Sequence, residues 1–173
     1  MIYFDDGNIL IRDMTDSDPS IIFHEETEQG YHRTKESFSN RLIDRQEGKA
    51  IPLVAEYNGK IAGYSNIYLY SPDALTEETF CNIIDFGVFI KYRKLGIGGK
   101  LMDAAEQIIA KYSDTAYLSV GLHSGYGSAH RIYIKRGYIP DGTGAWYAAA
   151  VCNPYKSYCL DDDLILKLSK KLR

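Results

Sequence analysis

The sequence contains few cysteines and no strong excess of charge. Its three cysteines, Cys81, Cys152 and Cys159, form no CxxC pair and no cluster with histidine, which argues against a zinc site or a disulfide framework. Sparse cysteines favour a reducing, cytoplasmic setting. The formal net charge of -3 lacks the basic excess typical of a nucleic-acid-binding protein. We therefore expect no bound metal and no nucleic-acid partner.

Long apolar runs are also missing. No segment approaches the roughly 18 continuous apolar residues that a membrane span requires, and the acidic N-terminal stretch MIYFDDGNIL does not have the pattern of a signal peptide. The 173 residues, 45% hydrophobic and 25% charged, fit one domain with a core of its own. We expect residues 1–173 to form a single domain, monomeric or homodimeric, with no membrane partner.

Hydrophobic periodicity and turn residues predict a mixed α/β sheet domain. The Asn58-Gly59 pair between two strand-like runs is a strong hairpin signal, and later elements follow a β-α-β order. Hairpins followed by such a crossover indicate a mixed sheet of about seven strands with flanking helices. Residues 141–162 show no clear period. The predicted strands are 8–14, 50–57, 60–70, 80–90, 115–122, a short one near YIPDG (138–142) and 163–169; the predicted helices are 20–29, 34–48, 95–111 and 128–136.

A glycine-rich turn, YRKLGIGGKLM (residues 92–102), lies between a predicted strand and a predicted helix. The first turn of a helix has N–H groups without internal partners and carries partial positive charge, and glycine lets a phosphate approach the backbone closely. The turn therefore predicts a phosphate site. A dinucleotide loop would need a third glycine where Leu101 stands. A Walker loop would need glycine at Lys94 and a hydroxyl at Leu101.

The remaining pattern, Arg93-x-x-Gly96-x-Gly98, resembles the acyl-CoA pyrophosphate loop of the GNAT superfamily of N-acetyltransferases. A second stretch, YGSAHRIYIKRGY (residues 126–138), is similar to the downstream motif of that superfamily. It matches the motif at Ala129, Tyr133, Gly137 and Tyr138, but Tyr126 occupies the asparagine position. The asparagine commonly helps to hold the cofactor arm, and Ser128 or His123 could replace that contact.

The resemblance implies an enzyme that moves an acetyl group from acetyl-CoA to a primary amine of a small molecule or peptide. Transfer would be direct, within a ternary complex, and acetyl-CoA would lie where the fourth and fifth strands splay apart. Lys94 to Gly99 would supply backbone amides to the pyrophosphate. The full set of residues expected at the cofactor is Phe86, Gly87, Val88, Arg93, Lys94, Leu95, Gly96, Ile97, Gly98, Gly99, Ser128 and Ala129.

Gly87 interrupts the strand that precedes the glycine loop, CNIIDFGVFI (residues 81–90). An internal glycine often marks a bulge or a close backbone approach, and the resemblance implies that this strand binds the pantetheine arm and the thioester carbonyl. Asp85 on the same strand has two interpretations. It is either a structural carboxylate or a general base whose pKa is raised by an apolar face.

Tyr133 also has two interpretations. It is either a core aromatic of the short helix or, as the resemblance implies, the general acid that protonates the leaving thiolate. His123, just after the fifth predicted strand, is either a second candidate base, because histidine titrates near neutral pH, or a structural or surface residue. Both pairs of alternatives stay open on the sequence alone.

The acceptor pocket, by resemblance, would be built from the first two helices and the last hairpin. Glu25, Glu26 and Glu28 in the first helix and the aromatic residues of 141–162 would suit a cationic amine. A solvated acidic helix face and packed loop aromatics explain the pattern equally well, so no acceptor is chosen. Two other functions stay open: a catalytically silent acyl-CoA-binding module of the same fold, and a nucleotide-binding α/β domain of another class, which would bind NAD or ATP.

Overall fold

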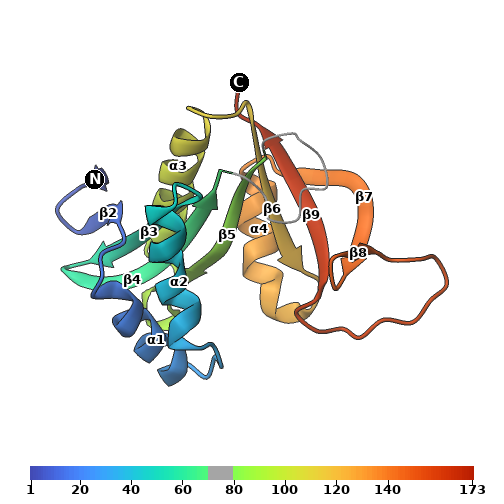
Figure 1. Ribbon diagram of the computed structural model, residues 1–173, viewed down its shortest axis with the longest axis horizontal. Coiled ribbons are helices and arrows are strands. Elements are labelled where there is room, and N and C mark those ends of the chain that lie inside the picture. The colour runs from blue at the N-terminus through green and yellow to red at the C-terminus, as the bar shows by residue number, and fades with distance from the viewer. Residues whose placement is uncertain (70–79) are drawn as a thin grey trace.

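The computed structural model describes residues 1–69 and 80–173, which fold into one mixed sheet flanked by helices (Figure 1). The last residue of the predicted strand 60–70 and the connection that follows it lie outside these ranges. The strands are β1 (Ile2–Asp5), β2 (Ile9–Asp13), β3 (Ala50–Tyr57), β4 (Lys60–Tyr68), β5 (Cys81–Val88), β6 (Thr115–Gly121), β7 (Ile139–Tyr147), β8 (Ala150–Val151) and β9 (Leu164–Lys171). The helices are α1 (Asp18–Glu28), α2 (Lys35–Gln46), α3 (Ile97–Ile109) and α4 (Gly127–Lys135), with single 3-10 turns η1 (Ile90–Tyr92) and η2 (Ser124–Tyr126).

The predicted α/β class and the four helices are confirmed, but the described residues form nine strands rather than about seven. The additional strands β1 and β8 are short edge strands. Strand β7 extends to Tyr147, into the stretch predicted to have no regular element. Its alternation is broken because Gly142 and Gly144 adopt φ values of 90° and 83°, and the pairing with β9 shifts register between Pro140 and Ala145.

Helices cover the sheet on both faces. On one face α1 and α2 pack through a small cluster that includes Ile22, Phe38 and Tyr64. On the other face α3 and α4 cover the larger core. The apolar stripe of α3 is buried in this core along the whole length of the helix. None of the four described helices is both long and apolar enough to cross a membrane.

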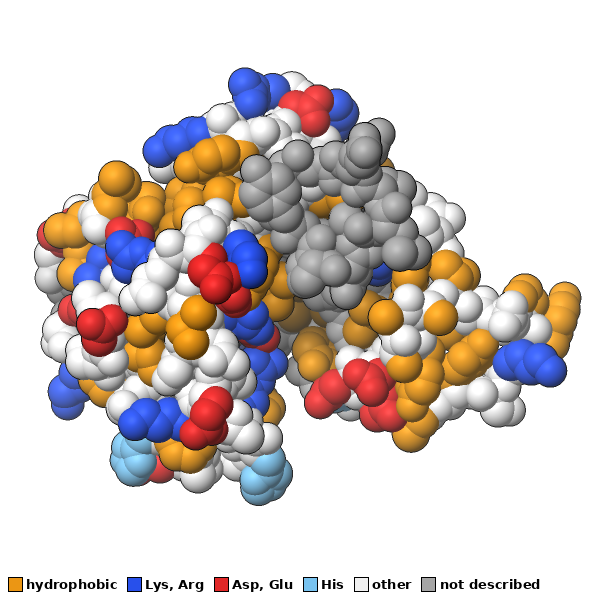
Figure 2. Space-filling view, viewed as in Figure 1, with side chains coloured by type: hydrophobic (Ala, Val, Ile, Leu, Met, Phe, Trp, Pro, Cys, Tyr) orange, Lys and Arg blue, Asp and Glu red, His pale blue; other side chains and the backbone are white. Residues whose placement is uncertain are grey.

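The sheet divides between β5 and β6, its only parallel pair within the described ranges. Cys81–Ile83 pair with residues 116–118, yet β5 continues to Val88 and β6 to Gly121. The predicted splay between the fourth and fifth strands is therefore confirmed at β5 and β6, which carry these numbers because β1 was not predicted. Figure 2 shows the molecule hollowed between the half that carries α1 and α2 and the C-terminal half.

Candidate active site

The glycine loop leads from the end of β5 into the N-terminus of α3. Lys94 and Gly96 adopt left-handed backbone conformations, with φ values of 67° and 84°, and these reverse the chain before the helix begins. No N–H group from Lys94 to Gly99 donates to an acceptor within residues 1–69 and 80–173, whereas Lys100 N donates to Gly96 O at 3.2 Å. A run of free N–H groups at the positive end of a helix is suited to binding an anion.

The side chains around the loop add positive charge. Arg93 is exposed, and its Nε donates to Val88 O at 3.1 Å, which ties the loop to the end of β5. Lys94 is also exposed and makes no ion pair with a described residue. Leu95 is 42% exposed, whereas Ile97 is buried in the core, so Ile97 could contact a ligand only through its backbone.

Each of the three glycines of the loop has a different structural environment. A Cβ on Gly98 would lie 3.3 Å from Phe86 Cζ and 3.5 Å from side-chain atoms of Val88 and Ile132. The start of α3 therefore packs closely against both β5 and α4. Gly96 requires its positive φ, whereas Gly99 is helical and faces open space. Space beside free N–H groups is consistent with a bound phosphate, so the residues present fit the pyrophosphate of acetyl-CoA.

Strand β5 contains a bulge at the point where it leaves β6. Asn66 pairs with Ile84 and Tyr64 pairs with Gly87, so two residues of β5 lie opposite one residue of β4. The residue in the left-handed conformation is Asp85, with φ 54°. A bulge, one of the two alternatives that Gly87 suggested, is present in this strand, but its residue is Asp85 rather than Gly87. Gly87 instead leaves room for the ring of Tyr64, 3.3 Å from where a Cβ would lie.

Asp85 is held by two arginines. Arg33 Nη1 donates to its Oδ1 and Arg41 Nη2 donates to its Oδ2, both at 2.7 Å, and Asn66 Nδ2 donates to Oδ2 at 3.3 Å. Burial alone would raise the pKa of Asp85, but the arginines outweigh it and hold the pKa below its usual value. The expected rise in this pKa is wrong, because Arg33 and Arg41 come from distant elements that no sequence pattern links to β5.

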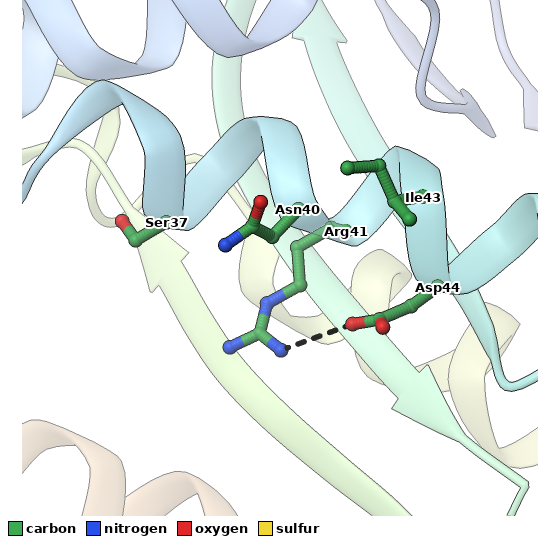
Figure 3. Close-up of a pocket in the computed structure, with 5 residues that line it drawn as sticks. All are labelled: Ser37, Asn40, Arg41, Ile43 and Asp44. Atoms are coloured by element: carbon green, nitrogen blue, oxygen red, sulfur yellow. Dashed lines mark ion pairs between the residues drawn. The ribbon is translucent and has the colours of Figure 1, made fainter.

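Arg41 reaches Asp85 from the side of α2 that faces the sheet. It lies in a surface depression of about 380 Å³ lined by Ser37, Asn40, Arg41, Ile43 and Asp44. Figure 3 shows the guanidinium extending from α2 toward β5, with an ion pair to Asp44 at 3.7 Å. Arg41 also donates to the hydroxyl of Tyr68, which in turn donates to Asp44. The candidate residues predicted from the sequence do not include Arg33, Arg41 and Asn66, because no motif or spacing marks them.

Tyr133 lies on the buried side of α4. Its side chain is 5% exposed, and its ring centroid is 6.0 Å from the rings of both Phe86 and Tyr138. Burial raises the pKa of Tyr133, so its hydroxyl keeps its proton at neutral pH. This hydroxyl makes no hydrogen bond to any described residue and so has a proton to donate.

Tyr126, in the asparagine position, belongs to a cluster at the end of β6. Its hydroxyl donates to Asp162 Oδ1 at 2.9 Å, and burial together with Asp162 raises the pKa of Tyr126 to about 12. His123 Nδ1 accepts from Gly125 N at 3.1 Å, so Nε2 carries the proton that Asp162 accepts at 2.9 Å. This arrangement leaves His123 no free lone pair and favours its structural interpretation.

The residues predicted near the cofactor on α4 lie in its first turn. Ser128 is exposed and hydrogen-bonds to no described residue, and Ala129 packs against the core. The structure thus brings Phe86 and Val88 of β5 together with Gly98 of α3 and with α4 around one end of the splay. The described residues contain no group of three or more histidine, cysteine or carboxylate side chains that could hold a metal.

The acidic side chains of α1 do not form one pocket. Glu25 pairs with Lys91 at 2.6 Å, whereas Glu26 is buried and accepts a hydrogen bond from the Tyr64 hydroxyl at 3.1 Å. Glu28 is exposed on the helix surface. Because each carboxylate has a different environment, the structure favours the alternative interpretation, in which they do not form one acidic pocket.

The aromatic residues of 141–162 mostly pack against their own neighbours. Lys167 Nζ lies 3.5 Å from the centre of the Trp146 ring, and the rings of Tyr147 and Tyr158 are 5.6 Å apart. Tyr155 is fully exposed. These contacts favour loop aromatics packed on the sheet over an aromatic wall shared with α1.

Comparisons with known proteins agree with the sequence motifs and the fold. The family model described as the acetyltransferase (GNAT) family matches residues 11–138. A search of curated proteins finds no match.

Several solved structures have a similar fold. An acetyltransferase from Salmonella typhimurium that modifies the N-terminal serine of a 50S ribosomal subunit protein superposes with a TM-score of 0.73 at 11% identity, covering 99% of both chains. A ribosomal-protein alanine N-acetyltransferase from Escherichia coli gives a TM-score of 0.68 at 14% identity, covering 95% of this chain and 94% of its own. Ard1 from Thermoplasma volcanium gives 0.67 at 19% identity, with 95% and 97% covered.

Proposed function

Because the chain belongs to the GNAT acetyltransferase family, we propose that it transfers an acetyl group from acetyl-CoA directly to a primary amine. The observation that carries this proposal is the run of N–H groups from Lys94 to Gly99 that have no acceptor within the described residues. These groups lie at the N-terminus of α3, beside the point where β5 and β6 separate. The amides would hold the pyrophosphate, and Arg93 and Lys94 would add charge.

The bound acetyl-CoA supplies an activated acetyl group as a thioester. The residues of this chain would orient it: the end of β5 from Phe86 to Val88 along the pantetheine arm, and the first turn of α4 around Ser128 and Ala129 on the other side. Tyr133 would donate its proton to the departing CoA sulfur, because its hydroxyl is protonated and otherwise unbonded within the described chain. Asp85 is a weak candidate for the base, since both of its oxygens are already paired.

The acceptor is a primary amine of a small molecule or a peptide. Two proteins with this fold are described as acting on ribosomal proteins, although their identities of 11% and 14% establish the fold alone. Peptide N-termini are therefore the first acceptors to test. A cytoplasmic location and a monomeric or homodimeric state stay predictions.

Thermal stabilisation by acetyl-CoA, compared with NAD and ATP, tests the donor. A ligand at 100 times its Kd adds about 2.7 kcal/mol to the free energy of unfolding, which is a readily measured shift in Tm. We expect this shift with acetyl-CoA and not with NAD or ATP; no shift with acetyl-CoA would refute the proposal. Binding without thioester cleavage across a panel of amines and peptides would favour the catalytically silent module, for which the replaced asparagine and the paired Asp85 are the supporting observations.

A further inference from the structure

We infer that Arg33 and Arg41 are positioning residues: through Asp85 they hold the β5 bulge in the shape that the acetyl end of the donor requires. The inference rests on the proposed function, because it assumes acetyl-CoA as the donor. It assigns Asp85 a role as an anchor between the acceptor-side helix α2 and the donor-side strand. Neither arginine belongs to a motif that the sequence analysis identified.

The bulge needs support from its surroundings. Asp85 has φ 54°, a left-handed conformation that residues other than glycine adopt at a cost, although aspartate and asparagine tolerate it best. Such a conformation persists where neighbouring contacts determine it. At Asp85 these contacts are made by the side chain, since both carboxylate oxygens accept charge-assisted hydrogen bonds from guanidinium groups.

The two arginines hold Asp85 from different elements. Arg41 is itself fixed on α2 by Tyr68 and Asp44, and its side chain is 23% exposed. Arg33 comes from the segment between α1 and α2, and its side chain is 44% exposed. The Asp85 side chain between them is 11% exposed. The position of the bulge is therefore tied to the helices on the face of the sheet opposite α3 and α4.

The consequence of the bulge appears one residue later. Phe86 follows Asp85 and contacts the other face, where its Cζ lies 3.3 Å from the Cβ position of Gly98. The Phe86 ring centroid is also 6.0 Å from that of Tyr133. The described pairing of β5 with β6 ends at Ile83, so β6 makes no backbone hydrogen bonds that would fix the bulge at Asp85. A shift at Asp85 would thus displace both the loop contact and the contact with the proposed acid.

Calorimetric titration of acetyl-CoA and of CoA, on the wild type and on Arg33→Gln and Arg41→Gln, tests the inference. The readout is the Kd for acetyl-CoA divided by the Kd for CoA. CoA lacks the acetyl group but would bind the same pyrophosphate loop. We expect the affinity for acetyl-CoA to fall roughly 2- to 10-fold, the value of about one hydrogen bond, while the affinity for CoA stays the same. Arg33→Gln keeps the test available if Arg41→Gln fails to fold, since Arg33 is half exposed.

Asp18→Asn is the matched control. Asp18 is paired with Arg12 at 2.7 Å, and its side chain, 2% exposed, is buried more completely than that of Asp85. This pair joins α1 to β2 and does not involve β5. We expect Asp18→Asn to lower Tm without changing the ratio of Kd values. If the two arginine variants behave in the same way, Arg33 and Arg41 have a structural role alone and the inference is wrong.

Asp85→Asn separates positioning from base catalysis, because asparagine also tolerates the left-handed backbone. The inference predicts that Asp85→Asn raises the Kd for acetyl-CoA relative to the Kd for CoA, as the arginine variants do. A base role would leave this ratio of Kd values unchanged, lower kcat and remove the acidic limb from the pH profile of the residual activity, and this result would overturn the inference. Failure of the wild type to bind either acetyl-CoA or CoA would instead refute the proposed function.

Discussion

Asp85 shows how the chemistry of one residue depends on partners that are distant in the sequence. The strand pattern correctly identified a carboxylate on a mostly apolar face, and from that alone a raised pKa follows. Arg33 and Arg41 reverse the direction of the shift, and they lie 52 and 44 residues away. A carboxylate held in this way is better suited to fixing the backbone than to accepting a proton.

Tyr133→Phe should lower kcat about 10- to 1000-fold, the range of single general-acid effects, if Tyr133 protonates the leaving thiolate. The substitution removes one hydroxyl that is bonded to no described residue and keeps the ring contacts with Phe86 and Tyr138. Steady-state kinetics of CoA release measure the effect, with the Kd for acetyl-CoA expected to stay within about 2-fold.

Tyr138→Phe is the control for this prediction, since it removes another buried phenol hydroxyl from an adjacent ring. It should leave kcat unchanged. An unchanged kcat for Tyr133→Phe would assign Tyr133 to the core alone. Equal losses in both variants would point to damage of the packing between α4 and the sheet.

At the scale of elements, the sequence correctly predicted those helices and strands that depend on turn residues and on hydrophobic periodicity. The Asn58-Gly59 turn and the apolar stripe of α3 were sufficient to place β3, β4 and α3. Only the start of strand β7, near residues 138–142, was predicted, because its two left-handed glycines interrupt the alternation, and pairing with β9 extends the strand to Tyr147. The loop of the candidate site was predictable from its glycines, but the anchoring of the bulge was not, since it depends on tertiary ion pairs.

Two glycines at the start of α3 are expected to change the free energy of unfolding in opposite directions when each is replaced by alanine. Gly99 is helical with open space around it, so Gly99→Ala should stabilise the unliganded protein by about 0.5–1 kcal/mol through helix propensity. Gly96 has φ 84°, so Gly96→Ala should destabilise it by about 1 kcal/mol. Urea unfolding measures both changes in the free energy of unfolding.

Ligand binding adds a second readout for the same pair of variants. If the amides near Gly99 contact a phosphate closely, the new methyl group of Gly99→Ala should weaken binding of CoA although the fold is more stable. Gains in both stability and affinity would contradict this placement of the pyrophosphate. A stabilising effect of Gly96→Ala would contradict the left-handed turn.

At the scale of the whole molecule, the two halves of the sheet share few backbone contacts. Strands β5 and β6 pair at three positions within the described residues, so side chains behind the splay must help to join the halves. Glu106 of α3 accepts hydrogen bonds from Arg136 Nε at 2.9 Å, just after α4, and from Lys170 Nζ of β9 at 2.7 Å. This carboxylate of α3, which packs against β3, β4 and β5, therefore binds two cations of the C-terminal half.

Glu106→Gln should lower the free energy of unfolding by about 2 kcal/mol at pH 7, because it leaves Arg136 and Lys170 without their shared anion. Burial would raise the pKa of Glu106, but Arg136 and Lys170 hold it below its usual value. A depressed carboxyl pKa stabilises the fold above its unfolded value of about 4.3 and loses this effect as the pH falls through the folded pKa. The difference in free energy of unfolding between the wild type and Glu106→Gln should therefore shrink below about pH 4, as urea unfolding at several pH values will measure.

Amide hydrogen exchange gives a second measurement of the same variant. In Glu106→Gln, exchange should become faster in β6 and β9 than in β3 and β4. The ion pair of Asp114 and Lys171 is exposed, so Asp114→Asn is a control that should have little effect. A difference that stays constant with pH, or exchange that rises equally in both halves, would contradict the view that Glu106 joins the halves behind the splay.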